Sequence, residues 1–240
     1  MPNAPAPTVT TATSPARTPV VELVVLDMAG TTVSDDGLVL AAFDTAATAV
    51  GLPDTGTERA DARRYVLDTM GQSKIEVFRA LFGDEDRARA ANSAFESAYD
   101  ARIDTGVQAI AGAVETVTAL RDAGIKVVLT TGFSPTTQHR ILDTLHWHDL
   151  ADAYLAPGDA GRGRPFPDLV LTAALRTGVS DMAAVAVVGD TSNDIDSGRR
   201  AGASVLVGVL TGAHSEAQLR TAGPTHVLAS VADLPALLLP

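Results

Sequence analysis

Short apolar runs recur along the chain, separated by stretches whose apolar residues repeat with a helical period. Five of these runs are rich in Val and Leu without strict alternation of polar residues, at 20–27, 126–131, 153–156, 185–190 and 204–209. Uninterrupted apolar runs are typical of strands in a parallel sheet that is covered on both faces. The pattern therefore predicts a buried parallel sheet.

The stretches between these runs have the amphipathic pattern of helices, at 114–123, 136–145, 168–176 and 194–201. Gly124, Gly178 and Gly202 stand where helices should stop, and glycine often ends a helix. Regular alternation of strands and helices indicates a doubly wound α/β core. In such a sheet ligands bind beyond the carboxyl ends of the strands, so the site is expected there.

One long segment breaks this alternation. It has no convincing strand, and helical patterns appear at 38–51, 59–68, 73–82 and 85–102. We therefore predict a helical cap domain at residues 37–106, inserted after the first strand and lying over the site. The α/β core would be formed by residues 19–36 and 107–240.

The first 18 residues are mostly Pro, Ala and Thr, and Arg17 is their single charge. This composition predicts a disordered tail at 1–18, and it lacks the apolar segment of a secretory signal. No apolar run approaches the roughly 20 residues that a membrane span needs. A cytoplasmic protein without a membrane partner is therefore expected.

The composition limits the classes of function further. The chain has 240 residues, is 46% hydrophobic and carries a formal net charge of −11, which argues against nucleic acid or an anionic membrane as the main partner. It has no cysteine, which excludes a disulfide framework, a thiolate metal site and a cysteine nucleophile. A small anionic substrate would need a cation or metal at its site.

Acidic residues stand at the ends of two predicted strands. Asp27 ends the first strand, and Gly30 allows a tight turn after it. Asp190 ends a later strand and is followed four residues on by Asp194. Carboxylates that meet at one sheet edge would repel each other unless a cation neutralises them, and Mg²⁺ prefers such hard oxygen ligands. The alternative is that these residues only cap a turn or a helix.

Two further strand ends carry groups that suit a phosphoryl oxygen. Thr131 and Gly132 offer a hydroxyl and backbone N–H groups before a helix, although an ordinary capped helix would look the same. Arg164 lies on a Pro-braced loop where its guanidinium could hold a phosphoryl group. A solvated loop arginine is the alternative, and Arg162 is a rival for the role.

Together these motifs resemble the haloacid dehalogenase superfamily in order, spacing and strand placement, from about residue 20 to residue 209. The resemblance implies that Asp27 is a nucleophile that forms an aspartyl-phosphate and that Thr131 binds a phosphoryl oxygen. It implies that Arg164 replaces the usual lysine. It also implies a Mg²⁺ site, with these ligands: Asp27, Asp190, the backbone carbonyl of Ala29, and Asp194 in support.

Most phosphatases of this superfamily have a second Asp two positions after the nucleophile, which protonates the leaving alcohol. Here that position is Ala29, which cannot do so. The run from Asp27 to Val33, and the sequence Met70-Gly71-Gln72-Ser73-Lys74, resemble the phosphonatase family, the phosphonoacetaldehyde hydrolases. That resemblance implies that Lys74 forms a Schiff base with an aldehyde, so that cleavage of the C–P bond leaves an enamine. It also implies substrate contacts at Met70 and Gly71.

The chain departs from this family at two places. The family's histidine three positions after the lysine is replaced by Val77, and its cysteine is absent. The five histidines lie outside the predicted cap, and His139 is expected on a helix surface. These departures leave open a substrate other than phosphonoacetaldehyde.

Lys74 also stands out without the resemblance, because it and Lys126 are the only lysines beside sixteen arginines. Lys126 opens a core strand at the end opposite the site. A capping box from Ser73 to Glu76 would place Lys74 in a first helical turn, whose dipole lowers the pKa of a lysine while Glu76 opposes the change. The alternative is a solvated lysine on a helix whose apolar face is formed by Ile75, Phe78 and Phe82.

The sequence therefore favours a Mg²⁺-dependent phosphonatase-like hydrolase. A phosphomonoester phosphatase and a catalytically weak binding module with the same fold are the alternatives. The expected partner is a small anionic phosphorus compound, and the resemblance favours a homodimer. The residues that could line or gate the cavity, in no order, are Glu22, Asp35, Asp36, Gln72 and Phe133.

Overall fold

The computed structural model describes residues 20–239, and the tail predicted at 1–18 lies outside them. Six parallel strands form one sheet in the order β5-β4-β1-β6-β7-β8. The strands are β1 (Leu23–Asp27), β4 (Lys126–Thr130), β5 (Ala153–Leu155), β6 (Val185–Gly189), β7 (Val205–Val209) and β8 (His226–Leu228). The predicted parallel sheet is confirmed, and β8 is a strand that the sequence pattern did not reveal.

Successive residues of the central strand point to opposite faces of the sheet. Val24 and Leu26 belong to one buried apolar cluster, while Leu23 and Val25 belong to another. Because both faces are covered, every position of β1 must be apolar until the strand ends at Asp27. This explains why the strands show no polar alternation in the sequence.

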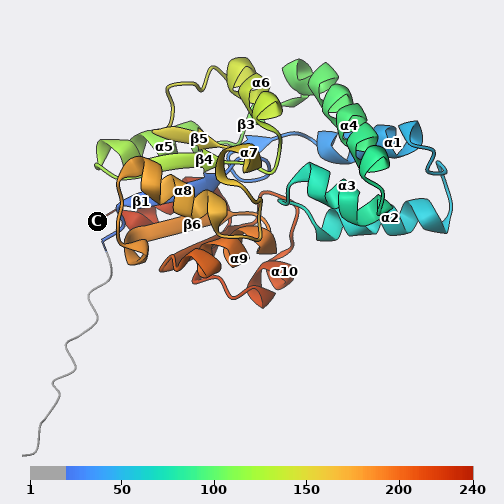
Figure 1. Ribbon diagram of the computed structural model, residues 1–240. Coiled ribbons are helices and arrows are strands. Elements are labelled where there is room, and N and C mark those ends of the chain that lie inside the picture. Colours follow the sequence, from blue (N-terminus) through green and yellow to red (C-terminus); the bar gives the residue numbers. More distant parts are fainter. Residues whose placement is uncertain (1–19, 240) are drawn as a thin grey trace, which may run out of the picture.

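Helices cover both faces and give the predicted doubly wound α/β fold (Figure 1). α5 (Ala113–Asp122), α6 (Pro135–Leu145) and α11 (Leu234–Leu238) contribute to the first cluster. α8 (Asp168–Thr177), α9 (Ser192–Ala201) and α10 (Glu216–Thr221) contribute to the second cluster. The short α7 (Pro157–Ala160) follows β5. Gly178 and Gly202 are the left-handed C-caps of α8 and α9, and Gly124 follows the C-cap of α5.

Four helices separate β1 from the rest of the sheet: α1 (Leu38–Ala49), α2 (Thr57–Asp68), α3 (Lys74–Phe82) and α4 (Glu85–Gly106). We call these helices, residues 38–106, the helical insert. They lie together at the right-hand end of the molecule in Figure 1. The chain enters and leaves the insert through a short antiparallel pair, β2 (Val33–Ser34) and β3 (Gln108–Ala109). The sequence did not predict this pair, because two residues are too few to show a period.

The interior of the insert is built from aromatic rings. Phe78 stacks near Phe43 and Phe82, with ring centroids 6.1 and 6.2 Å away, and meets Phe95 edge-on at 6.0 Å. These rings belong to the same buried cluster as one face of the sheet. Insert and sheet are therefore packed through one continuous apolar core, and Val77, at the position of the family's histidine, is buried within it.

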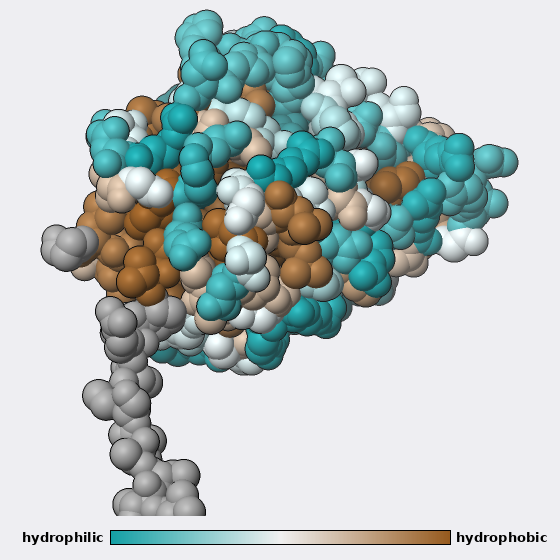
Figure 2. Space-filling model, turned by 60° about the vertical axis from the view of Figure 1, so that its left-hand side comes forward, coloured by the Kyte–Doolittle hydropathy of each residue, from teal (hydrophilic) through white to brown (hydrophobic). Residues whose placement is uncertain are grey.

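The surface in Figure 2 contains both hydrophobic and hydrophilic residues. Hydrophobic colours gather near the grey segment, and hydrophilic colours prevail at the far end of the molecule. Within residues 20–239, no helix has the length and apolar character that crossing a membrane requires.

We expect Phe78→Ala to lower the free energy of unfolding by about 3–5 kcal/mol, because the buried ring leaves a cavity among three other rings. The measurement is urea unfolding followed by circular dichroism. Phe166→Ala is the matched control, since Phe166 is 42% exposed and its ring lies under the guanidinium groups of Arg162 and Arg200. Equal losses for the two variants would contradict a continuous core through the insert.

Candidate active site

Three acidic side chains meet at the carboxyl edge of the sheet. Asp27 ends β1, Asp190 directly follows β6, and Asp194 lies in the first turn of α9. Each offers a carboxylate oxygen, and these oxygens lie within 4.8 Å of one another. All three side chains are buried, with at most 4% of any residue exposed. The structure thus brings together the carboxylates that the strand ends suggested.

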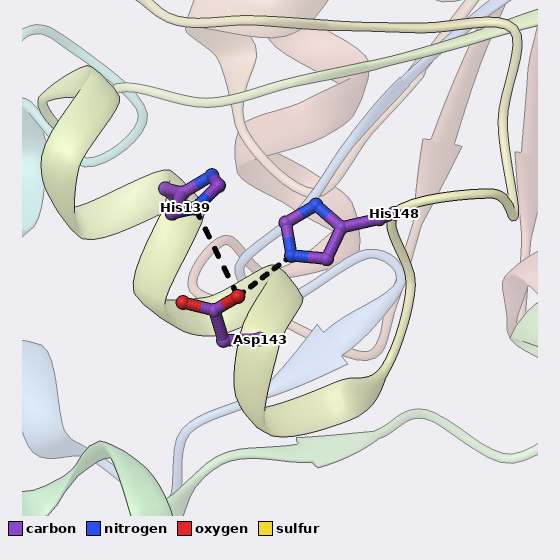
Figure 3. Close-up of side chains that lie close together, drawn as sticks. All are labelled: His139, Asp143 and His148. Atoms are coloured by element: carbon purple, nitrogen blue, oxygen red, sulfur yellow. Dashed lines mark hydrogen bonds and ion pairs between the residues drawn. The ribbon is translucent and has the colours of Figure 1, made fainter.

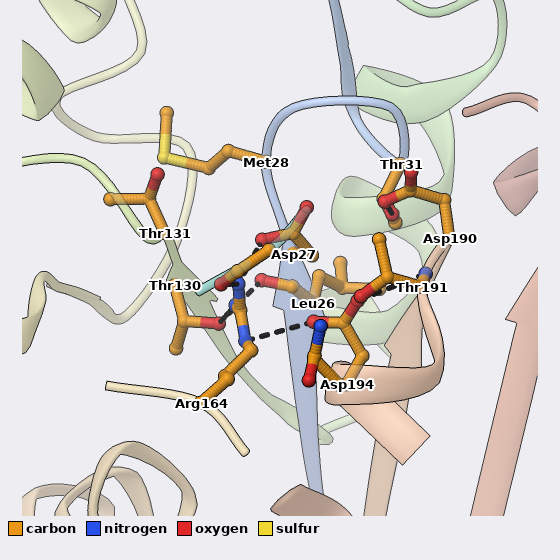
Figure 4. Close-up of polar contacts among 12 residues, drawn as sticks. Leu26, Asp27, Met28, Thr31, Thr130, Thr131, Arg164, Asp190, Thr191 and Asp194 are labelled. Atoms are coloured by element: carbon orange, nitrogen blue, oxygen red, sulfur yellow. Dashed lines mark hydrogen bonds and ion pairs between the residues drawn. The ribbon is translucent and has the colours of Figure 1, made fainter. Parts of the chain in front are cut away.

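Arg164 lies between two of these carboxylates (Figure 4). Its Nη1 is 2.6 Å from Oδ1 of Asp27, and its Nε is 2.8 Å from Oδ1 of Asp194. It also donates to the hydroxyl of Thr130, opposite Asp27 in the sheet register. Arg164 is 5% exposed, so the alternative of a solvated loop arginine is wrong. The rival Arg162 instead pairs at the surface with Asp168.

Asp194 has two environments. Its Oδ2 accepts hydrogen bonds from the N–H and hydroxyl of Thr191, at 3.1 and 2.5 Å, and so caps α9. Its Oδ1 is buried and accepts no hydrogen bond within residues 20–239, although Arg164 Nε lies 2.8 Å away. The helix-cap interpretation is therefore correct for one oxygen, and the other is directed to the site.

The loop that follows β7 contacts Asp190, and the sequence analysis did not identify it. The N–H of Ala213 donates to Oδ2 of Asp190 at 2.7 Å, and the hydroxyl of Thr31 donates to Oδ1 at 3.2 Å. A Cβ added at Gly30, which has φ +85°, would lie 2.5 Å from Asp190 Oδ2, and one added at Gly212 would lie 2.0 Å from it. The sequence did contain a signal for this loop, because the apolar run that forms β7 ends at the same sheet edge just before Gly212.

This crowding changes the acidity of the carboxyl groups. Burial raises the pKa of Asp27 well above its usual value; Arg164 opposes the change, whereas Asp194 and Asp190 add to it. Burial and the nearby Asp194 raise the pKa of Asp190 to about 7. Such a buried, carboxylate-rich set has the donor chemistry that a hard divalent cation prefers, and Asp194 Oδ1, which accepts no hydrogen bond and pairs with Arg164, is one of its oxygens. The cluster can therefore hold a metal ion.

The loop after β4 provides neutral donors. The Thr131 hydroxyl accepts from the N–H of Phe133 at 3.2 Å, which leaves its own proton free to be donated. The N–H of Thr131 bonds to Leu155, whereas within the described chain the N–H of Gly132 has no partner. Both Thr131 and Gly132 line the cavity at the carboxylates. Each can therefore donate to an anionic group there.

The segment 70–74 of the insert rests directly on the core loops. Asn193 Nδ2 donates to the carbonyl of Met70 at 2.7 Å, and the N–H of Lys74 donates to the carbonyl of Gly132 at 3.2 Å. A Cβ at Gly71 would lie 2.7 Å from the Thr191 hydroxyl. Met70 and Gly71, predicted to contact substrate, line the cavity while they also pack on the core.

Lys74 is the first residue of α3, and its side chain enters the cavity. Its Nζ lies 5.3 Å from the centroid of the Phe133 ring. Burial lowers the pKa of Lys74, while Asp27 and Asp35 oppose that change. The pKa is thus lowered in the predicted direction, mainly by burial, and the alternative of a solvated surface lysine is wrong.

The predicted capping box around Lys74 is also wrong. Ser73 is the N-cap residue of α3, but its side chain makes no capping hydrogen bond. Ser73 is buried against Gly163, where an added Cβ would lie 2.9 Å from Ser73 Cβ, and Glu76 pairs instead with Arg79 at 2.6 Å. Tertiary packing overrides the local pattern here.

The cavity that joins these groups has a volume of about 320 Å³. Ala29 lines it beside Asp27, so no carboxyl group stands at the position of the missing acid. Asp35, Asp36 and Phe133 line the cavity, whereas Glu22 and Gln72 do not. Lys126 lies at the other end of β4, 3.4 Å from Asp152.

His139 lies on the exposed surface of α6 and does not line the cavity. With Asp143 and His148 it forms a surface cluster (Figure 3), in which His148 Nε2 lies 2.7 Å from Asp143 Oδ1. The expectation of a helix-surface histidine is confirmed.

Comparison with known proteins identifies the family. Residues 21–202 match the model of haloacid dehalogenase-like hydrolases. The chain belongs to this family. It is an enzyme of the hydrolase class, and its relatives include phosphonatases and phosphatases.

Three relatives illustrate the range within the family. The phosphonoacetaldehyde hydrolase of Bordetella pertussis is 29% identical over 154 residues, and the match spans 55% of this chain and 56% of the relative, about half its length. The protein named probable phosphatase IndB of Dickeya dadantii is 24% identical, over 88% of this chain and 91% of the relative. The solved structure of a phosphonoacetaldehyde hydrolase-like protein from Oleispira antarctica is 25% identical, with a TM-score of 0.80, and covers 96% of this chain and 95% of its own.

The raised pKa of Asp190 predicts a pH-dependent stability of the chelator-treated protein. Between the ordinary pKa of 3.8 and about 7 the folded state retains a proton that the unfolded state has released, so folding is favoured at low pH. We expect the unfolding temperature to fall as the pH rises through about 7, and Asp190→Asn to flatten this fall. Calorimetry from pH ~5 to pH ~8 measures it.

Asp61→Asn, on the exposed face of α2, serves as the control and should keep the wild-type slope. Mg²⁺ at high pH should raise the unfolding temperature of the wild type more than that of Asp190→Asn. An unchanged slope in Asp190→Asn would refute the assignment.

Proposed function

We propose that the chain is a phosphonatase-like hydrolase that cleaves the C–P bond of a small phosphonate with a carbonyl group next to the phosphorus-bearing carbon. The observation that carries the proposal is the shared cavity: Asp27 and Lys74 both line it, and Ala29 occupies the place of the usual acid. A nucleophile for phosphorus and an amine for a carbonyl are the two groups that this reaction needs.

The proposed reaction begins at Lys74 and ends at Asp27. The amine of Lys74 condenses with the carbonyl and releases water, which leaves a protonated imine. A carboxylate oxygen of Asp27 bonds to phosphorus while the C–P bond breaks, and the electron pair of that bond moves into the imine to give an enamine. Protonation at carbon and hydrolysis restore Lys74 and release the aldehyde. Water then releases inorganic phosphate from Asp27.

The phosphoryl group would be held from several sides. The hydroxyl of Thr131 and the N–H of Gly132 would donate to its oxygens, and Arg164 would orient Asp27. Asp27, Asp190 and the carbonyl of Ala29 would hold Mg²⁺, with Asp194 in support. The ion would neutralise negative charge on the phosphoryl group.

Lys74 is in a state that suits an imine-forming amine. A neutral amine is the reactive form, and burial lowers the pKa of this lysine. Within the described residues Lys74 makes no ion pair, so no carboxylate fixes it in the charged form. The fold similarity to the phosphonoacetaldehyde hydrolase-like protein and the match to the Bordetella enzyme support the same chemistry.

A phosphomonoester phosphatase is the second candidate. The full-length match to the probable phosphatase of Dickeya dadantii favours it. Because Ala29 offers no proton to a leaving alcohol, this activity would require a substrate with a good leaving group. In both cases the substrate is small and anionic, and the net charge of −11 disfavours nucleic acid as a partner. The homodimer and the cytoplasmic location remain predictions.

Incubation with phosphonoacetaldehyde and Mg²⁺, followed by borohydride, separates the candidates. Phosphate release together with a reduced adduct at Lys74, located by mass spectrometry, supports the proposal. Phosphate release from phosphomonoesters without any adduct from the aldehyde supports the phosphatase.

We expect Asp27→Asn to reduce phosphate release by on the order of 10³-fold or more with either kind of substrate, because the amide oxygen is a poor nucleophile. The colorimetric phosphate assay measures this loss, and circular dichroism confirms folding. Activity near the wild-type level in this variant would contradict a covalent role for Asp27.

We expect Lys74→Arg to abolish both the borohydride adduct and phosphate release from the phosphonate, because a guanidinium forms no imine under these conditions. Lys126→Arg is the matched control, since it changes the other lysine of the chain, at the remote end of β4. A phosphonate activity that survives Lys74→Arg would refute the Schiff-base route.

A further inference from the structure

A further carboxylate, beside those of Asp27 and Asp190, faces the cavity from the entrance to the helical insert. Asp35 lies in the turn between β2 and α1 and lines the cavity together with Lys74. Its Oδ1 accepts from the N–H of Gly37 at 3.2 Å, and its Oδ2 accepts from the hydroxyl of Tyr99 at 3.3 Å. These two hydrogen bonds therefore fix the orientation of the Asp35 carboxylate.

The turn that holds Asp35 has an unusual backbone. Asp36 and Gly37 both have positive φ, of 46° and 83°, a conformation that Gly and Asp tolerate better than most residues. The N–H of Leu38 closes the turn on the carbonyl of Asp35 at 2.8 Å. The backbone geometry of the turn therefore positions the Asp35 carboxylate independently of contacts with the helical insert.

Tyr99 connects this turn to the lysine. It lies in α4, is fully buried, and its ring centroid is 4.7 Å from that of Phe133. The same Phe133 ring lies under the Nζ of Lys74 at 5.3 Å. Within the described chain Asp35 and Lys74 make no ion pair with each other, although both line the cavity of about 320 Å³. The two side chains therefore line one cavity without contacting each other.

The proposed reaction needs a proton carrier at that place. The ammonium of Lys74 must lose a proton before it attacks, and the carbinolamine must gain one before it loses water. Ala29 cannot carry a proton, and Val77 is buried in the apolar core. Of the other carboxyl groups that line the cavity, Asp27 is the proposed nucleophile and pairs with Arg164, Asp190 belongs to the acidic cluster that would hold the metal ion, and Asp36 is exposed.

We propose that Asp35 is the catalytic acid and base that serves Lys74. It takes a proton from the ammonium as the amine attacks the carbonyl. A second proton passes from the nitrogen to the new alkoxide oxygen, and Asp35 then returns its own proton to the resulting hydroxyl group, which leaves as water. The protonated imine and one water result, and Asp35 is again a carboxylate. Tyr99 is a positioning residue that holds Oδ2. This inference rests on the proposed function.

The electrostatics agree with this role. Burial raises the pKa of Asp35, while Gly37, Tyr99 and Lys74 oppose the change and Asp36 adds to it. Burial lowers the pKa of Lys74, and the nearby charges are Asp27, Asp35, Arg164 and Asp190. The two values therefore move toward each other, which favours proton transfer in both directions.

The test measures trapping of an aldehyde at Lys74 by borohydride, with phosphonoacetaldehyde and with acetaldehyde, across a range of pH. We expect Asp35→Asn to lower the plateau rate of trapping about 100-fold or more. We also expect the midpoint of its pH profile to move down, because one of the carboxylates that stabilise the ammonium is then absent. Asp61→Asn, an exposed carboxyl group of α2 that does not line the cavity, should change neither quantity. Tyr99→Phe should slow trapping with the adduct still at Lys74.

A wild-type rate and midpoint in Asp35→Asn would overturn the inference. Slow trapping with a midpoint of the pH profile that moves up, toward that of a solvated lysine, would also overturn it. That result would show that the substitution lets water into the cavity. A wild type that traps no aldehyde at Lys74 overturns it as well. Phosphate release by the wild type tests the proposed function separately. If trapping at Lys74 depends on Asp35 but no phosphate is released, only the proposed C–P cleavage is rejected.

Discussion

The site depends on the burial of three carboxylates around one guanidinium. Asp27, Asp190 and Asp194 are brought to one sheet edge by the ends of β1 and β6, and Arg164 pairs with two of them. Burial raises the pKa values of Asp27 and Asp190, and the neighbouring carboxylates add to the rise, because one positive charge cannot neutralise three negative charges in a medium of low dielectric. The remaining negative charge is what gives this edge of the sheet its capacity for a divalent cation.

The helical insert is placed by close backbone contact with this edge. Segment 70–74 lies on the loops that follow β4 and β6, and side chains larger than hydrogen at Gly71 or Gly132 would collide with Thr191 or Gln72. The backbone of Lys74 is bonded to Gly132, the residue whose N–H also faces the cavity. The amine of the insert and the core loop that follows β4 are therefore positioned by one shared contact, and a shift of either would move both.

The sequence predicted the parts of the molecule that rest on periodicity and strand ends. Uninterrupted apolar runs identified five strands because both faces of the sheet are buried, and Asp27 and Asp190 stood out because they end such runs. Partners fixed only by tertiary packing could not be predicted. The capping box at Ser73 failed because Ser73 packs against Gly163, and the role of the loop around Ala213 depends on β7 lying beside β6. Asp35 could not be ranked above Asp36, because only the folded turn leaves Asp36 exposed and brings Asp35 to the hydroxyl of Tyr99.

The alanine at position 29 bears on where in the molecule the reaction needs proton transfer, in the core or at the helical insert. When a P–O bond breaks, the electron pair goes to an oxygen that must be protonated beside the nucleophile, within the core. When a C–P bond breaks next to an imine, the pair goes to the nitrogen of Lys74, so proton transfer is needed at the insert instead. A methyl group at Ala29 together with a carboxylate at Asp35 and an amine at Lys74 is the distribution that the second reaction requires. In such an enzyme the core provides phosphoryl transfer, and the residues around the insert determine which carbon skeleton is released.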